Sequence, residues 1–315
     1  MNRKAVIFGI KRDKLTNKEK LLFKKFKPWG IILFSRNIKN ISQLKKLVED
    51  IKKIFKDKKY PILIDQEGGK VSRLNNIIDL SAFSQHFFGK SYIKDKKLFY
   101  SHYKIHINTI CDILKNAGIN INTVPVLDVR RKKSHNIIGS RSFSENSTIV
   151  SNLGKLCINF YEKNKIATVM KHIPGHGLSK CDSHYKTPVI STDKEELFKK
   201  DFKPFKINNS FFAMTAHAIY SKFDSHNTAT HSKTIIKKII RNYMNFKGIL
   251  MSDDISMKSL RYSVEENALR ALHAGCNLVL HCNANIREMS KLIKVIPKID
   301  KFTQKKTTHF YKFLG

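Results

Sequence analysis

The stretch KHIPGHGLSKCDSH, residues 171–184, carries three histidines, two lysines and an aspartate directly after the apolar run ATVM (167–170). Side chains of these types can bind a zinc ion, cradle a phosphate, or form the acid/base pair of a hydrolase. The composition of this stretch does not choose among the three. The polar residues elsewhere in the chain therefore decide which chemistry is possible.

Ionisable residues also follow other apolar runs of the chain. They are Asp65 after PILI, Asp128 after VPVL, His217 after AMTA, and Asp253 and Asp254 after ILMS. Burying such groups costs several kcal/mol each unless they have partners, so their position at one end of each run favours a functional interpretation. If the runs are parallel strands of a barrel, these residues converge at the carboxyl ends of the strands, where barrel active sites lie.

The elements that position these residues are short apolar runs alternating with helical patterns. The eight runs span 5–10, 30–34, 61–64, 122–127, 167–170, 211–216, 248–252 and 277–282, and the predicted helices span 16–26, 42–55, 144–164, 193–207, 232–244 and 264–275. Runs without polar alternation are typical of strands buried on both faces. Eight strand–helix units favour an α/β fold, a TIM-like (β/α)₈ barrel, over an open doubly wound sheet.

No linker, repeat or low-complexity block divides the chain, so we expect residues 1–315 to form a single (β/α)₈ catalytic domain. The segment 66–99 has the weakest pattern and is too long for an ordinary loop. It is predicted to be a functional excursion after the third strand.

Composition excludes several classes of protein. The formal net charge is +35, from 60 Lys and Arg against 25 Asp and Glu, but the lysines are spread along the whole chain. Because nucleic-acid binders usually gather their charge into a stripe or tail, we expect a solvated lysine-rich surface and no nucleic-acid partner. A weaker possibility is that the positive field attracts an acidic small substrate.

The five cysteines form no Cys-x-x-Cys pattern, which is typical of reduced, cytosolic thiols. The N-terminus has no secretory signal core, and no run approaches the length of a membrane span. We therefore expect a cytoplasmic protein that does not bind membranes.

The chain resembles a known family through six motifs in order: DQEGGKVSRL, PVLDV, IGSRSF, KHIPGHGLSKCDSHYKTP, MTAHAIY and GILMSDDISM. Together they are similar to the β-N-acetylglucosaminidases of glycoside hydrolase family 3, of the single-domain peptidoglycan-recycling type. The resemblance spans about residues 28–284. It implies removal of non-reducing terminal GlcNAc from 1,6-anhydro-muropeptides with retention of configuration. Independently of the resemblance, we expect a monomer without a cofactor or metal.

The resemblance also assigns roles to residues. It implies that Asp253 is the nucleophile and that His184 with Asp182 is the acid/base pair. The residues that it implies for substrate binding are Asp65, Arg73, Arg141, Lys171 and His172. Three departures from the family pattern affect substrate affinity and peptide preference: Lys70 where an arginine is common, the basic insertion RRKKSHN (130–136), and the extreme charge.

The chemistry of the reaction is compatible with a histidine as the acid/base group. A retaining glycosidase needs a carboxylate on one side of the anomeric carbon and a proton donor on the leaving-group side. Histidine titrates near neutrality and gains basicity from a carboxylate partner, so it can donate a proton and later take one from water.

Alternative functions remain at this stage. His172, His176, Asp182 and His184 could form a zinc shell in a metal-dependent amidohydrolase, but the cation of Lys171 would oppose a bound dication. A β-glycosidase for glucose or xylose and a basic binding protein are the other candidates. We expect His176 and His217 to be hydrogen-bonded supporting residues and Cys181 to have no chemical role.

Overall fold

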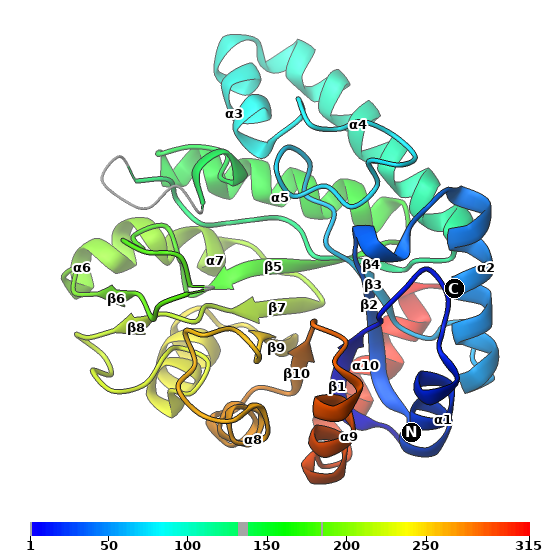
Figure 1. The fold of residues 1–315 in the computed structure, drawn as a ribbon. Helices are drawn as coiled ribbons and strands as arrows, with labels where there is room; N and C mark the ends of the chain where they lie inside the picture. Colours follow the sequence, from blue (N-terminus) through cyan, green and yellow to red (C-terminus); the bar gives the residue numbers. More distant parts are fainter. Residues whose placement is uncertain (1, 132–137, 184) are drawn as a thin grey trace.

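The protein is a closed barrel of eight parallel strands surrounded by helices (Figure 1). The computed structural model describes residues 2–131, 138–183 and 185–315. The strand order around the barrel is β1-β10-β9-β7-β5-β4-β3-β2. The strands are β1 (Lys4–Gly9), β2 (Pro28–Leu33), β3 (Ile62–Ile64), β4 (Ile121–Asn122), β5 (Ala167–Ile173), β7 (Phe212–Thr215), β9 (Ile249–Asp254) and β10 (Leu278–His281). The predicted TIM-like barrel is confirmed.

Each barrel strand coincides with one of the eight predicted apolar runs, because each is buried on both faces. The fourth run was predicted to span 122–127, but the strand there, β4, is only two residues long. Pro125 has no N–H to donate to a ladder. Beyond it the chain still follows β5, with the Leu127 N–H donating to the Lys171 carbonyl at 2.7 Å.

Four of the predicted helices form as single α-helices. They are α1 (Asn17–Phe26), α2 (Ile41–Phe55), α5 (Ser147–Lys163) and α8 (Val264–Ala274). The capping box read from the sequence is present at α1, where the Glu19 N–H donates to Thr16 Oγ1 and the Glu19 carboxylate accepts from the Thr16 N–H at 2.8 Å.

The other two predicted helices contain π-helical turns. The first is divided into α6 (Lys194–Glu196), a π-helical turn at Leu197–Asp201, and α7 (Lys203–Ile207), and the second is π-helical over Ile235–Tyr243. Such turns often occur at functional sites. The first of them ends at Asp201, whose side chain is completely buried.

The segment 66–99, predicted to be a functional excursion after the third strand, is helical in its second half. Helix α3 (Gln85–Lys94) and the start of α4 (Lys96–Ala117) occupy it, and the two helices pack against each other outside the barrel (Figure 1). The helical pattern is obscured by exposed apolar residues, among them Phe87 and Ile93.

Two helices and two short strands at the periphery were also not predicted from the sequence. Helices α9 (Ile286–Val295) and α10 (Lys301–Phe313) follow the last strand, and β6 (Val189–Ile190) pairs with β8 (Ile219–Tyr220) outside the barrel. Within the described ranges, no helix is both long and apolar enough to cross a bilayer.

Candidate active site

A cavity of about 180 Å³ opens where the barrel strands end. Six of the predicted site residues line it: Asp65, Arg73, Arg141, Lys171, His172 and Asp253. They come from the ends of β3, β5 and β9 and from the loops after β3 and β4. The sequence motifs that lie far apart along the chain are therefore brought to one place.

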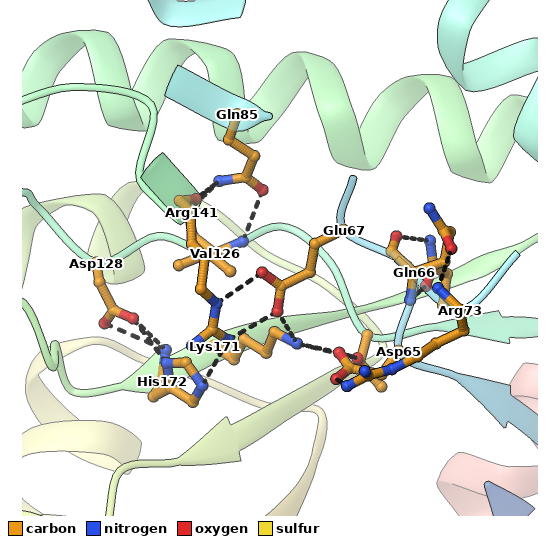
Figure 2. Close-up of polar contacts among 12 residues, drawn as sticks. Asp65, Gln66, Glu67, Arg73, Gln85, Val126, Asp128, Arg141, Lys171 and His172 are labelled. Atoms are coloured by element: carbon orange, nitrogen blue, oxygen red, sulfur yellow. Dashed lines mark hydrogen bonds and ion pairs between the residues drawn. The ribbon is translucent and has the colours of Figure 1, made fainter. Parts of the chain in front are cut away.

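The first part of the site is a set of paired charges that we call the strand-end cluster, shown in Figure 2. Its members are Asp65, Glu67, Arg73, Arg141 and Lys171. Lys171 Nζ lies 2.5 Å from Asp65 Oδ1 and 2.6 Å from Glu67 Oε1, so one ammonium joins the two carboxylates. It also donates to Thr123 Oγ1 at 3.1 Å, which engages all three of its N–H bonds.

Two guanidinium groups complete the strand-end cluster. Arg73 Nη2 donates to Asp65 Oδ2 at 2.8 Å, and Arg141 donates to both oxygens of Glu67, from Nε at 2.8 Å and from Nη2 at 2.7 Å. Arg73 Nε is buried and has no hydrogen-bond partner within the described part of the chain. A buried donor without a partner beside a cavity is suited to a ligand oxygen.

The charges of the strand-end cluster fix one another's protonation states. Burial alone would raise the pKa of Asp65, but the cations of Lys171 and Arg73 hold it well below its usual range. Burial would also raise the pKa of Glu67, but the cations of Arg141 and Lys171 lower it. Both groups are therefore carboxylates at neutral pH, and the cluster is a preorganised charge array.

The local fold turns these side chains toward one another. In the loop after β3, Gln66 Oε1 accepts the backbone N–H groups of Arg73 at 2.7 Å and of Leu74 at 3.1 Å, which closes the turn. A Cβ atom at Gly68 would lie 2.4 Å from the Phe83 carbonyl oxygen, so this turn requires glycine. Gln85 of α3 donates to the Arg141 carbonyl at 2.7 Å and so anchors the second loop (Figure 2).

His172 is fixed by a buried carboxylate. Its Nδ1 lies 2.7 Å from Asp128 Oδ2, and its Nε2 lies 3.5 Å from Arg141 Nη2 (Figure 2). Burial would raise the pKa of Asp128, but the neighbouring His172 lowers it. The imidazole is thereby held with its Nε2 edge toward the cavity.

The two adjacent aspartates at the end of β9 differ in how they are held. The Asp254 carboxylate accepts from Ser256 Oγ at 2.9 Å and from the backbone N–H groups of Ser256 and Cys282 at 3.0 and 3.2 Å. Within the described residues, the only hydrogen bond to the Asp253 carboxylate comes from the Asp254 N–H, at 2.8 Å. Burial would raise the pKa of Asp253, but His217 and His172 lower it, so Asp253 is an ionised carboxylate in the cavity.

His176 and His217 are both hydrogen-bonded inside the protein. His176 contacts Ser179 Oγ, and burial lowers its pKa to about 4. His217 bonds Thr230 Oγ1 through Nδ1 and the Asp254 carbonyl through Nε2, and burial lowers its pKa as well. Burial thus disfavours the charged form of both rings, and their hydrogen bonds agree with the expected supporting role.

The remaining predicted residues, Asp182 and His184, follow β5 in the sequence. Asp182 is partly buried beside Ser183, which lines the cavity. His184 lies outside the described residues. Cys181 is partly exposed, and its thiol faces the Lys186 carbonyl at 3.9 Å rather than the cavity lining. Among the residues that the structure describes, no group of three or more His, Cys, Asp or Glu could hold a metal ion.

Glu67 and Thr123 are members of the site that sequence reasoning missed, and Asp128 was noted only as a strand-end charge. Glu67 sits in a Gly-Gly turn, a context typical of a surface residue. The signal that could have identified it is an acidic residue two positions after Asp65, in the same motif as two predicted ligands. Its partner Arg141 lies 74 residues away.

Comparison with known proteins gives one consistent result. The model of the glycosyl hydrolase family 3 N-terminal domain matches residues 5–308. A β-hexosaminidase of Haemophilus influenzae is 32% identical over 289 residues, covering 89% of this chain and 79% of the relative. Another, from Psychromonas ingrahamii, is 32% identical over 305 residues, or 93% and 88% of the two chains.

A solved structure extends the likeness to three dimensions. The crystal structure of NagZ from Neisseria gonorrhoeae in complex with N-trifluoroacetyl-D-glucosamine superposes with a TM-score of 0.87 at 29% identity. The match covers 100% of this chain and 90% of that one.

Proposed function

The chain belongs to glycosyl hydrolase family 3, and from this premise we propose that it is a retaining β-N-acetylglucosaminidase that removes non-reducing terminal GlcNAc from 1,6-anhydro-muropeptides. That it is a glycoside hydrolase follows from the family itself. The choice of sugar is supported by the relatives named β-hexosaminidase and by the N-trifluoroacetyl-D-glucosamine bound to the gonococcal NagZ.

One observation carries the mechanism: of the two carboxylates that end β9, one is engaged by three donors and the other is not. A nucleophile must approach the anomeric carbon without first breaking strong hydrogen bonds. We therefore assign attack to Asp253 and the shaping of the strand end to Asp254. The anomeric carbon forms a bond to an Asp253 oxygen as its bond to the leaving oxygen breaks.

The strand-end cluster and His172 bind the sugar in this proposal. Arg73 and His172 line the cavity, and the buried Arg73 Nε keeps an unused N–H beside it. Lys171 and Thr123 donate to Asp65 Oδ1 and Arg73 donates to Oδ2, so Oδ2 can still accept one sugar hydroxyl. Lys171, whose N–H bonds are all engaged, acts chiefly by fixing Asp65 and Glu67.

His184, paired with Asp182, supplies the acid/base step. The assignment follows the family resemblance, and it agrees with the bonding of two other histidines nearby, because His176 and His217 are hydrogen-bonded to the protein and burial lowers their pKa. In the first half-reaction the imidazolium gives its proton to the departing oxygen. In the second the neutral imidazole takes a proton from water as the water attacks the anomeric carbon and releases Asp253.

We place this reaction in the recycling of peptidoglycan fragments in the cytoplasm. The substrate is a small molecule with an acidic peptide, which suits a chain with a formal charge of +35. We propose no membrane or nucleic-acid partner.

A panel of p-nitrophenyl β-glycosides tests the activity directly. The proposal predicts rapid release from the β-GlcNAc compound and slow release from the β-glucoside and β-xyloside, which lack the acetamido group. Equal or greater activity on the glucoside would replace this function with that of a β-glucosidase. A fluorinated GlcNAc substrate that forms the glycosyl-enzyme rapidly but hydrolyses slowly should label the peptide that contains Asp253.

A further inference from the structure

Arg131 is the second residue of the basic segment that departs from the family pattern, and it pairs with a completely buried carboxylate. Its Nη2 donates to Asp201 Oδ2 and its Nε to Asp201 Oδ1 at 3.4 Å. Its Nη1 lies 3.3 Å from Glu196 Oε1. Burial raises the pKa of Asp201 to about 6 even with Arg131 beside it, so the charge of Asp201 depends on this partner.

Asp201 packs directly against the start of the loop after β5. A Cβ atom added to Gly175 would lie 2.8 Å from the Asp201 carbonyl oxygen and 3.2 Å from its Cβ. Gly175 adopts φ +139°, and its carbonyl accepts the buried hydroxyl of Tyr220 at 2.6 Å. No side chain fits between Gly175 and Asp201, so a shift of Asp201 displaces the loop.

The loop after β4 contacts the next two residues. The His176 N–H donates to Asp128 Oδ1 at 2.6 Å, and a Cβ atom at Gly177 would lie 1.9 Å from the Val129 carbonyl oxygen. Residues 175–177 are therefore enclosed between the loop after β4 and Asp201. Arg131 links the loop after β4 to Asp201. It belongs to that loop, two residues after Val129, and its guanidinium bonds the Asp201 carboxylate.

We propose that Arg131, acting through Asp201, is a positioning residue for the loop that carries the acid/base pair. Without its cation the buried carboxylate takes up a proton or admits water, and the contact with Gly175 relaxes. Proton transfer to a leaving group is sensitive to displacements of about 1 Å, so the acid step weakens. The inference rests on the proposed function, which assigns Asp182 and His184 to that loop.

The test compares two substrates, p-nitrophenyl and methyl β-N-acetylglucosaminide. They carry the same sugar, but their leaving groups differ in how much they need a proton. A phenolate leaves with little assistance, whereas the alkoxide of methyl β-N-acetylglucosaminide requires the acid. Arg131→Ala should raise the ratio of aryl to methyl glycoside activity by about tenfold, part of the 10²–10⁴ that general acid catalysis contributes. A change that merely lowers the amount of folded enzyme reduces both activities equally and leaves the ratio unchanged.

Two variants control for charge and position. Arg130→Ala removes the adjacent arginine, which contacts His86 and not Asp201, and should leave the ratio at the wild-type value. Arg131→Lys keeps a cation near Asp201 and should recover most of the lost ratio. If Arg131→Ala does not fold, Arg131→Gln, which keeps a polar side chain beside Asp201 but removes the cation, should still raise the ratio, and an unchanged ratio in a folded Arg131→Gln overturns the role of Arg131.

The same measurement with His184→Ala separates this inference from the proposed function. The proposed function predicts a raised ratio in His184→Ala, and positioning predicts no further rise when Arg131→Ala is added to it. A raised ratio in His184→Ala with an unchanged ratio in Arg131→Ala overturns the role of Arg131 alone. An unchanged ratio in His184→Ala overturns both assignments.

Discussion

The strand-end cluster and the outer part of the loop after β5, residues 178–183 and 185–187, belong to one proposed site but are held in different ways. In the cluster, the side chains of Glu67 and Lys171 are only 1% and 3% exposed, and every charge has an opposite charge within 2.8 Å. In the loop, Lys180, Tyr185 and Lys186 are exposed, and the loop returns to the barrel through the Thr187 hydroxyl, which donates to the Ser259 carbonyl at 2.6 Å.

The difference follows from what each region has to do. A sugar that is bound before and during the reaction benefits from charges that are already oriented, because no reorganisation is then needed. An acid/base group must serve a departing sugar in one half-reaction and a water molecule in the next, which suits a loop with several exposed side chains. Four substitutions sharpen this comparison.

The largest effect should come from Asp253→Ala, which removes the nucleophile that both regions serve. Hydrolysis of the aryl glycoside and of the muropeptide should both fall by about 10⁴-fold or more, since no covalent intermediate forms. Azide should restore turnover and give the glycosyl azide of inverted configuration, measured by NMR. Residual activity within a hundredfold of wild type would show that the nucleophile lies elsewhere.

Glu67→Ala should have the largest effect on stability. It leaves Arg141 without its bidentate carboxylate and Lys171 with a single anion, and breaking a buried ion pair typically costs about 3–5 kcal/mol. The free energy of unfolding in urea measures the loss, and Glu67→Gln, which keeps the shape, should lose less. A loss under about 1 kcal/mol would mean that the strand-end cluster is less tightly coupled than its distances indicate.

Arg73→Ala should lower kcat/KM on the aryl glycoside and the muropeptide by the same factor, about 10- to 150-fold. This corresponds to one charge-assisted hydrogen bond of about 1.5–3 kcal/mol. Lys94→Ala is the control, because Lys94 is an exposed cation at the end of α3 and does not line the cavity. Unchanged kinetics in Arg73→Ala, or an equal loss in both variants, would place the sugar outside the strand-end cluster.

The smallest effect should come from Tyr185→Ala in the loop. Its side chain is 70% exposed, and exposed substitutions usually change the free energy of unfolding by less than about 0.5 kcal/mol. Thermal unfolding measures this change. A destabilisation above about 1.5 kcal/mol would show that this part of the loop is packed, which removes the contrast between the two regions.

The barrel could be predicted from the sequence because its strands are short apolar runs bounded by polar residues, and a run buried on both faces has few other interpretations. Helix α3 could not, since its exposed Phe87 and Ile93 break the helical pattern. Asp65 and Lys171 were predictable as charges that follow apolar runs. Glu67 was not, because its function depends on Arg141, which only the closed barrel brings within 2.8 Å.

The most direct test of the division between the two regions is the ratio of activity on the aryl glycoside to activity on GlcNAc-anhydro-muropeptide, measured in Arg73→Ala and His184→Ala. If the strand-end cluster binds the sugar and the loop supplies the proton, Arg73→Ala lowers both activities and keeps the wild-type ratio. His184→Ala instead retains appreciable aryl glycoside activity, and its ratio rises by about 10²-fold or more. A His184→Ala variant that loses both activities equally would contradict the account.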